Sequence, residues 1–346
     1  MSYFKRLSSF KNEIIKDKNT FGIRGWDTGI SNVDEILSYV KGFSTVVFSY
    51  AHHGKTQFII DNCVFLARKY KVVSAMYLTE AGKRSQAVLD IMQTLVGKQI
   101  QEITDEEFMI ALDFIDKYFL FADIDTKLVS IEEIYTEVEA LIKSGVKIDN
   151  VVIDHFHQLE QSPEQKFMDR ADKTKYVMRK IGKESRRLDI HTFLTMHVRD
   201  TSPIQCPTSK LYYLPPPEKE DISGGQQASY LAYNMVSVWR PVMGEDKFGI
   251  INPSTGLPYA VNETIISVAK VKPKGSAKLG KRSIFFDVNK QRYYSVEGGV
   301  KIYAVDSLKK GKPNDSENEV LATSGEESAL KPNLNFGLEG LEDAPF

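Results

Sequence analysis

Short, continuously apolar runs alternate along the chain with longer segments in which apolar residues recur every three or four positions. The apolar runs, which predict strands buried on both faces, lie at residues 43–50, 72–78, 118–122, 146–153 and 191–196. The segments with helical spacing lie at residues 55–70, 84–96, 106–117, 131–144 and 170–188. Further strands are expected at residues 234–239, 264–271 and 283–287. This alternation predicts an α/β fold, with a twisted, parallel-strand-rich sheet and helices on both faces.

Polar and charged stretches mark the boundaries of this pattern. Residues 1–21 carry apolar residues at helical spacing and are expected to form a linker helix ahead of one domain over residues 22–306. Residues 307–346 hold four lysines and eight acidic residues, a net charge of −4, which leaves +3 on residues 1–306 from the total of −1. Because this tail is rich in small and polar residues and lacks an apolar period, we expect it to be mostly disordered. The Pro-rich stretch 201–220 is expected to be a long loop.

Composition narrows the class of protein without naming a partner. The chain has 42% hydrophobic and 26% charged residues, which is typical of a globular protein rather than a fibre. Its two cysteines, Cys63 and Cys206, exclude a disulfide scaffold and suit a reducing compartment. No run approaches the roughly 18 apolar residues of a membrane span, and the N-terminus lacks the apolar core of a secretory signal. We therefore expect a soluble, cytoplasmic protein.

The strongest local motif is Ser49-Tyr-Ala-His-His-Gly-Lys-Thr56, which follows an expected strand and opens an expected helix. A phosphate-binding loop needs small residues around the phosphates, a lysine for the β- and γ-phosphates, and a hydroxyl for Mg²⁺. Gly54, Lys55 and Thr56 fit these roles, His52 and His53 lie within the same loop, and Ser49 stands where the general pattern has glycine. We expect the Lys55 side chain to be exposed in this loop. A chance Gly-Lys-Thr at a helix start is the alternative.

Three further polar residues follow expected strands. Asp154 ends the strand at 146–153, where a carboxylate beside a phosphate loop can hold Mg²⁺. Glu80 lies just beyond the second strand, where a base can polarise an attacking water. His197 follows the strand at 191–196 and can donate a hydrogen bond to a γ-phosphate. Each taken singly is also explained as an ordinary surface residue, but together they predict an NTP-hydrolysing site at the carboxyl ends of the strands.

Five segments, in this order, resemble the motifs of DnaB-type hexameric helicases, with a style close to the bacteriophage branch. They span residues 22–295 and read Gly25-Trp-Asp-Thr-Gly-Ile-Ser-Asn-Val-Asp34, Tyr77-Leu-Thr-Glu80, Val152-Ile-Asp-His155, Leu194-Thr-Met-His197, and Asp221-Ile-Ser-Gly-Gly225 through Trp239-Arg240 to Ala269-Lys-Val-Lys272. Proteins of this family also lack the first glycine of the loop, as this chain does at Ser49. The resemblance implies a RecA-like P-loop NTPase fold, a homo-hexameric ring, and ATP with Mg²⁺ bound between neighbouring subunits.

The resemblance also implies roles for individual residues. Lys55 and Thr56 carry over as phosphate and Mg²⁺ ligands, Asp154 as the acid on the metal side, Glu80 as the catalytic base and His197 as the phosphate sensor. The arginine finger of the family falls on Lys272, with Lys270 beside it. This is a departure, because lysine lacks the bidentate fork of arginine.

The DNA-facing loops of the family fall near residues 161–174 and 201–227, and they imply contacts from Lys166, Arg170, Lys173, Gly224 and Gly225. A solvated helix face is the other explanation of these basic residues. We expect no counterpart of the accessory domain of DnaB-type proteins here, the chain being either a minimal motor or one whose partner modules are separate chains. Primase, loader or polymerase partners would therefore dock on the N-terminal helix or the C-terminal tail.

Two kinds of function remain open from the sequence. The first is an ATP-dependent replicative DNA helicase that translocates on single-stranded DNA and unwinds duplex. The alternative is a RecA-like DNA-dependent ATPase of recombination or regulation that does not unwind, which Lys272 favours. A scaffold that binds ATP but hydrolyses it poorly is disfavoured by Glu80 and Asp154.

Overall fold

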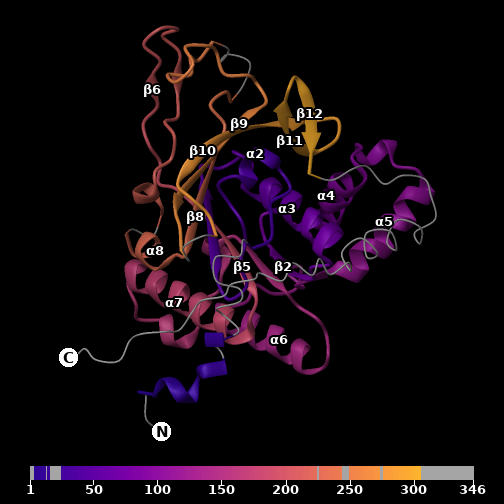
Figure 1. Ribbon diagram of the computed structural model, residues 1–346, viewed down its shortest axis with the longest axis vertical. Helices are drawn as coiled ribbons and strands as arrows, with labels where there is room; N and C mark the ends of the chain where they lie inside the picture. Colours follow the sequence, from indigo (N-terminus) through magenta and orange to yellow (C-terminus); the bar gives the residue numbers. More distant parts are fainter. Residues whose placement is uncertain are drawn as a thin grey trace, which may run out of the picture. The chain divides into compact units, whose positions relative to one another are not determined.

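Ten strands form one continuous sheet in the computed structural model, which describes residues 4–12, 14–15, 25–223, 226–243, 249–272 and 276–304 (Figure 1). The strand order is β12-β11-β10-β9-β8-β1-β5-β4-β2-β3. The six parallel strands are β1 (Ser44–Ser49), β2 (Ser74–Leu78), β3 (Phe119–Phe121), β4 (Asn150–Asp154), β5 (His191–His197) and β8 (Asn234–Trp239). The antiparallel strands are β9 (Glu263–Lys270), β10 (Gly280–Asp287), β11 (Arg292–Glu297) and β12 (Val300–Tyr303).

Helices cover both faces of the parallel strands (Figure 1). One face carries α2 (Ser31–Asp34), α3 (Lys55–Tyr70), α4 (Arg84–Val96) and α5 (Asp105–Tyr118). The other carries α6 (Ile131–Lys143), α7 (Arg170–Leu188) and α8 (Gln226–Leu231). Successive strand residues serve opposite faces: Val47 packs in the first of two core clusters, whereas Val46 and Phe48 pack in the second. This two-sided burial explains why the parallel strands read as continuous apolar runs.

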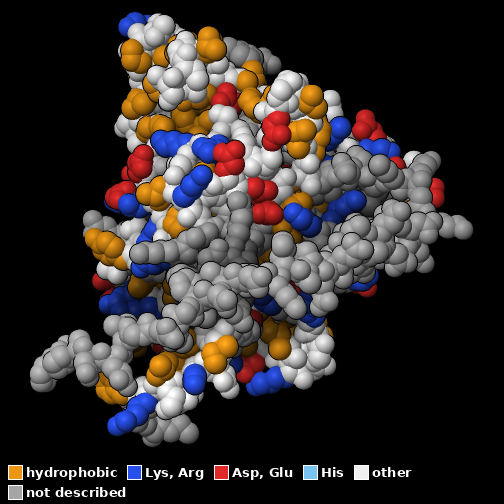
Figure 2. Space-filling view, in the orientation of Figure 1, with side chains coloured by type: hydrophobic (Ala, Val, Ile, Leu, Met, Phe, Trp, Pro, Cys, Tyr) orange, Lys and Arg blue, Asp and Glu red, His pale blue; other side chains and the backbone are white. Residues whose placement is uncertain are grey.

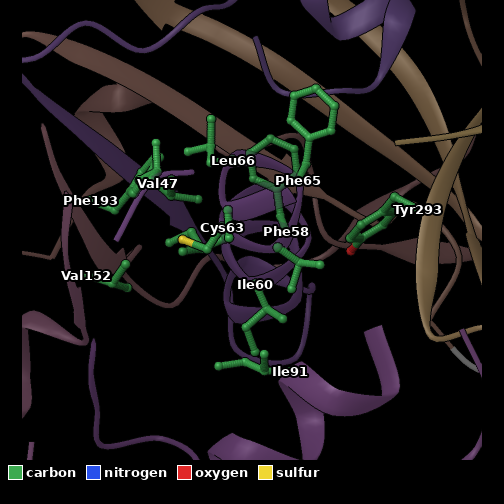
Figure 3. Close-up of a cluster of buried hydrophobic side chains, with 14 of the residues drawn as sticks. Val47, Phe58, Ile60, Cys63, Phe65, Leu66, Ile91, Val152, Phe193 and Tyr293 are labelled. Carbon is green, nitrogen blue, oxygen red and sulfur yellow. The ribbon is translucent and has the colours of Figure 1, made fainter. Parts of the chain in front are cut away.

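Helix α3 packs deeply against the sheet, on the face that also carries α2, α4 and α5. Its Phe58, Cys63 and Leu66 are fully buried and gather with Val47 and Phe193 of the sheet (Figure 3). Truncating a buried phenylalanine such as Phe58 to alanine typically costs about 3–5 kcal/mol of the free energy of unfolding. The N-terminus of α3, where the phosphate-loop motif ends, is therefore held firmly on the sheet.

The structure agrees with the expected helices and parallel strands to within a few residues. The capping box at α6 is confirmed, because Ser130 Oγ accepts from Glu133 N and the Glu133 carboxylate accepts from Ser130 N at 2.8 Å. Strands β11 and β12 were not predicted. Five short 3-10 helices complete the described elements: Leu7–Ser9, Ile100–Glu102, Phe156–Gln158, Pro163–Gln165 and Lys219–Asp221. Leu7–Ser9 falls in the expected linker helix, and the expected tail at 307–346 lies outside the described residues.

The expected loop at 201–220 contains a small hairpin of its own. Strands β6 (Ile204–Gln205) and β7 (Tyr212–Tyr213) pair antiparallel, and the Trp239 indole donates to Leu214 O at 3.1 Å. Figure 2 shows hydrophobic side chains gathered over this arm, in agreement with the exposure of Ile204 and Tyr212. The stretch is thus an ordered arm rather than a plain loop.

Candidate functional site

The phosphate-loop motif connects β1 to α3 at the carboxyl edge of the sheet. Gly54 has φ 93°, and a Cβ at this position would collide with the Tyr293 hydroxyl, so both backbone shape and space require glycine. Ser49, which replaces the usual first glycine, is fully buried and donates its hydroxyl to Val238 O of β8. Ser49 therefore ties the start of the loop to the neighbouring strand and is not part of the surface that faces a ligand.

Lys55 is buried, with 3% of its surface exposed, so the expectation of an exposed side chain was wrong. Its ammonium turns back under the loop, donates to Tyr50 O at 2.9 Å and lies 3.3 Å from His197 Nδ1. Burial lowers the pKa of Lys55, and the nearby carboxylates of Glu80 and Asp154 act against this shift. The amine is thus held inside the loop by groups of the chain itself.

Asp154 lies fully buried at the end of β4, between two hydroxyl groups. Thr56 Oγ1 donates to Asp154 Oδ2 at 2.6 Å, and Thr195 Oγ1 donates to Asp154 Oδ1. Burial, followed by the charge of Glu80, raises the pKa of Asp154. A desolvated carboxylate beside a second acid and a threonine hydroxyl is a set of hard oxygen ligands, which fits a divalent cation such as Mg²⁺.

Glu80 follows β2 and contacts two histidines from other strands. Glu80 Oε1 lies 2.7 Å from His197 Nε2 and 3.4 Å from His155 Nε2, while Thr56 Oγ1 lies 3.4 Å from Glu80 Oε2. The hydrogen bond from His197 is the largest cause that lowers the pKa of Glu80 to about 2. Glu80 is therefore ionised at neutral pH and sits next to the hydroxyl that also touches Asp154.

Glu80, His155 and His197 place one ligand atom each within 4.8 Å of one another, the spacing of a metal site. The tautomers of His155 and His197 argue against a metal site here. His197 Nδ1 faces the Lys55 ammonium, which can only donate, and His155 Nδ1 accepts from His157 N at 3.1 Å. Each neutral ring must then carry its proton on Nε2, the atom that faces Glu80. The cluster is a carboxylate surrounded by N–H donors, which leaves no imidazole lone pair for a metal.

His53, Arg240 and Tyr293 line the other side of the loop. His53 is buried and its Nδ1 accepts from Arg240 N at 3.0 Å, and burial lowers its pKa to about 4, so this ring is neutral. His52 is exposed with φ 63°. Arg240 Nε is buried without a partner among the described residues. Arg240 and Tyr293 were not predicted as site residues, although the Trp239-Arg240 pair in the resemblance was a usable signal.

Lys270 and Lys272 lie far from this phosphate loop. Lys270 is the last residue of β9 and pairs with Met235, and just beyond it Lys272 N donates to Asn234 Oδ1 at 3.0 Å, at the start of β8. The loop contacts the opposite end of β8 through Arg240 N, and six residues of strand span roughly 20 Å. The four-carbon stem of a lysine cannot cover that distance. Lys270 is also occupied, because its amine donates to Tyr230 O at 2.9 Å and to Ser229 O.

The basic residues of the first expected DNA loop lie around the start of α7. Lys166 and Arg170 are exposed, and Arg170 donates to Ser223 Oγ, which joins the loop at 161–174 to the one at 201–227. Between them Phe167 is 93% exposed, with Lys166 Nζ 5.9 Å from its ring centroid. Phe167 was missed because an aromatic in a polar loop has no periodic signal. Lys173 is half-buried. The Gly224 and Gly225 prediction lies outside the described residues.

Solved structures share this arrangement, although no protein-family model and no curated protein matches the sequence. The ATPase domain of a phage helicase matches with a TM-score of 0.64 and 15% identity, over 85% of this chain and 100% of that domain. A DnaB-like replicative helicase, described with its interactions with primase, matches with a TM-score of 0.61 and 15% identity, over 85% of this chain and 68% of its own. The chain has the fold of a DnaB-type helicase motor.

The match confirms the predicted RecA-like architecture, which is the fold that the resemblance implied. At this level of identity the match establishes the fold alone, so the roles of Lys55, Glu80 and the other site residues rest on their geometry. No helix in the described part of the chain combines the length and apolar character needed to cross a bilayer.

Proposed function

We propose that this chain is an ATP-driven motor that translocates on single-stranded DNA as a ring and unwinds duplex DNA. The observation that carries the proposal is the convergence of Lys55, Thr56, Glu80, Asp154 and His197 within hydrogen-bonding reach at one edge of a DnaB-type sheet. Phosphoryl transfer is catalysed mostly by positioning and by electrostatic stabilisation, and these side chains supply the charges and donors that it requires.

The loop and the buried acid would bind the nucleotide. Lys55, already desolvated, would exchange Tyr50 O and His197 for the phosphate oxygens of ATP or a related nucleoside triphosphate. Thr56 and Asp154 would hold Mg²⁺, which when bound neutralises charge on the phosphates. The raised pKa of Asp154 supports this assignment, because burial and the charge of Glu80 outweigh the nearby Lys55 ammonium, and a bound cation would favour the ionised carboxylate.

Glu80 would take the proton of the attacking water, and His197 would sense the γ-phosphate by donating a hydrogen bond to it. The low pKa of Glu80 describes the carboxylate while it is bound to His197; release of that hydrogen bond raises its basicity. His197 lies within reach of both Lys55 and Glu80, so it can turn between a phosphate oxygen and the base. The proposed mechanism therefore couples phosphate recognition to activation of the base.

The remaining proposed roles concern neighbours. Lys272 would reach the ATP of an adjacent subunit in a homo-hexameric ring, because it cannot reach its own loop. Lys166, Arg170 and Lys173 would follow the phosphate backbone of single-stranded DNA, and Gly224 and Gly225 would allow close backbone approach. Primase, loader or polymerase would bind through the N-terminal segment or the tail.

A strand-displacement assay tests the proposal directly. A forked DNA duplex with ATP and Mg²⁺ should be separated by the wild-type protein, and Lys55→Met should abolish separation while leaving the fold intact. ATP hydrolysis stimulated by single-stranded DNA without any strand separation would refute unwinding. That outcome would support the second candidate, a RecA-like DNA-dependent ATPase, which the lysine at position 272 favours because it is a weaker substitute for an arginine finger.

A further inference from the structure

We propose that His155 is a positioning residue that holds Glu80 while His197 turns to the phosphate. The inference rests on the proposed ATPase function and adds to it a residue for which the motifs gave no role. His155 Nε2 lies 3.4 Å from Glu80 Oε1, the same oxygen that His197 Nε2 contacts at 2.7 Å. One oxygen of the Glu80 carboxylate thus has a close hydrogen-bond partner in His197 and a second N–H donor, His155, somewhat farther away.

The backbone carries Glu80 and His155 as one unit. Thr79, the residue before Glu80, donates its N–H to Asp154 O at 2.7 Å and its hydroxyl to the same carbonyl at 2.8 Å. The Thr79 hydroxyl also accepts from His155 N at 3.2 Å. These three hydrogen bonds fasten the end of β2 to the end of β4, so the backbones of Glu80 and His155 keep their separation when other groups move, and only the side chains need adjust.

The backbone N–H of His157 sets the tautomer of His155. Its Nδ1 accepts from His157 N at 3.1 Å, so the proton of the neutral ring lies on Nε2 and faces Glu80. The ring is buried and packs edge-on against His197, with centroids 4.8 Å apart. A fixed tautomer on a buried ring makes His155 a ready donor, without rotation or proton transfer.

His197 has a competing task that His155 lacks. His197 projects from β5 next to β1, and its Nδ1 lies 3.3 Å from the Lys55 amine, where the phosphates are expected. When His197 engages a phosphate it gives up Glu80, and an unrestrained carboxylate would then sample several rotamers. A small approach of His155 Nε2 would make a full hydrogen bond and keep Glu80 aimed at the water.

The test compares hydrolysis by His155 variants in two backgrounds. His155→Ala should lower kcat for ATP roughly 10- to 100-fold with KM changed less than about threefold, because misplacing a base costs rate rather than binding. His155→Gln, whose amide can donate from a similar position, should recover to within about fivefold of wild type. His157→Ala keeps the backbone N–H that sets the tautomer and is the matched control, with kcat within about twofold.

The Glu80→Gln background separates positioning from general damage. If His155 acts through Glu80, His155→Ala should change the single-turnover rate of Glu80→Gln by less than about threefold. An undiminished 10- to 100-fold loss in that background, or a wild-type kcat for His155→Ala, would overturn the inference. If His155→Ala does not fold, His155→Leu, which fills the buried site but has no N–H donor, takes its place in the same comparison. A wild-type protein without nucleotide hydrolysis would instead refute the proposed function itself, and this inference with it.

Discussion

Replacing Lys55 by methionine tests the proposed nucleotide site most directly, because the change removes a charge and keeps most of the packing. Methionine has nearly the length of the lysine stem and fills a buried site well. The lost hydrogen bond from Lys55 Nζ to Tyr50 O costs about 1.5–3 kcal/mol for a charged donor. Relief of the burial that lowers the pKa of Lys55 acts in the opposite direction. We therefore expect the free energy of unfolding to change by less than about 2 kcal/mol.

The effect on catalysis should be larger. Removing one donor directed at developing transition-state charge typically costs about 3–4 kcal/mol, or 10²- to 10³-fold in rate. Lys55 is 3% exposed, so its charge acts in a poorly screened environment and the upper part of that range is expected. Phosphate release by Lys55→Met should accordingly fall at least about 100-fold, with and without single-stranded DNA.

Lys69→Met is the matched control, since it makes the same change at the other end of α3, about 21 Å away by helix geometry. Lys69 pairs with Asp27 at the surface, so its loss should leave turnover within about twofold and stability within about 1 kcal/mol. Thermal melts of both variants establish folding before the rates are compared. Turnover by a folded Lys55→Met within tenfold of wild type would refute the assignment of this loop to phosphate.

Other changes probe the remaining parts of the site. Glu80→Gln should retain ATP binding, measured by nucleotide fluorescence, while hydrolysis falls at least about 100-fold; lost binding would make Glu80 structural. Because the pKa of Glu80 lies at about 2, below its ordinary value of 4.5, its ionised form stabilises the fold above about pH 4.5. The difference in unfolding free energy between wild type and Glu80→Gln should therefore vanish as the pH falls towards 2; a constant difference would contradict this. Phe167→Ala should weaken binding to single-stranded DNA about 5- to 100-fold and remove any preference over an abasic strand, whereas Lys166→Ala should mainly reduce the salt dependence. Mixing Lys272→Ala with Lys55→Met subunits should restore part of the activity, and strictly additive loss would argue against action between subunits.

The sequence predicted the site-bearing half of the fold closely, for a physical reason. Parallel strands buried on both faces have a strong apolar signal, and α3 begins and ends at the predicted residues Lys55 and Tyr70. Parallel strands also end at one edge, so placing Asp154 and His197 after two of them was enough to bring them near Lys55. The contacts at this edge thus followed from strand order rather than from any one motif.

Features decided by side-chain partners could not be predicted in this way. Strand β11 begins with Arg292, which is fully buried because its guanidinium donates to Leu95 O at 2.7 Å and to Thr94 O at 2.5 Å at the end of α4. From sequence alone a charged residue is predicted to be exposed, because the hydrogen-bond acceptors that would allow its burial are not known. The burial of Lys55 was not predicted for the same reason, because the acceptor of its amine, Tyr50 O, belongs to the loop itself. His155 was noted in its motif but given no role, because the contacts that hold it, from Thr79 to its backbone and from His157 N to its ring, form only in three dimensions.

The two ends of β8 bear on the proposed ring, once the proposed role of Lys272 is granted. Its carboxyl end holds the phosphate loop through Val238 and Arg240, and its amino end holds Lys272 through Asn234. A rigid strand buried in the centre of a sheet keeps these groups roughly 20 Å apart in every conformation of one chain. If Lys272 supplies the proposed cation, a subunit cannot apply it to its own loop and needs a neighbour placed head-to-tail, and repeating that contact would close a ring when the rotation permits. On this proposal, the rate of ATP hydrolysis would depend on the adjacent subunit, and an isolated chain would hydrolyse ATP slowly.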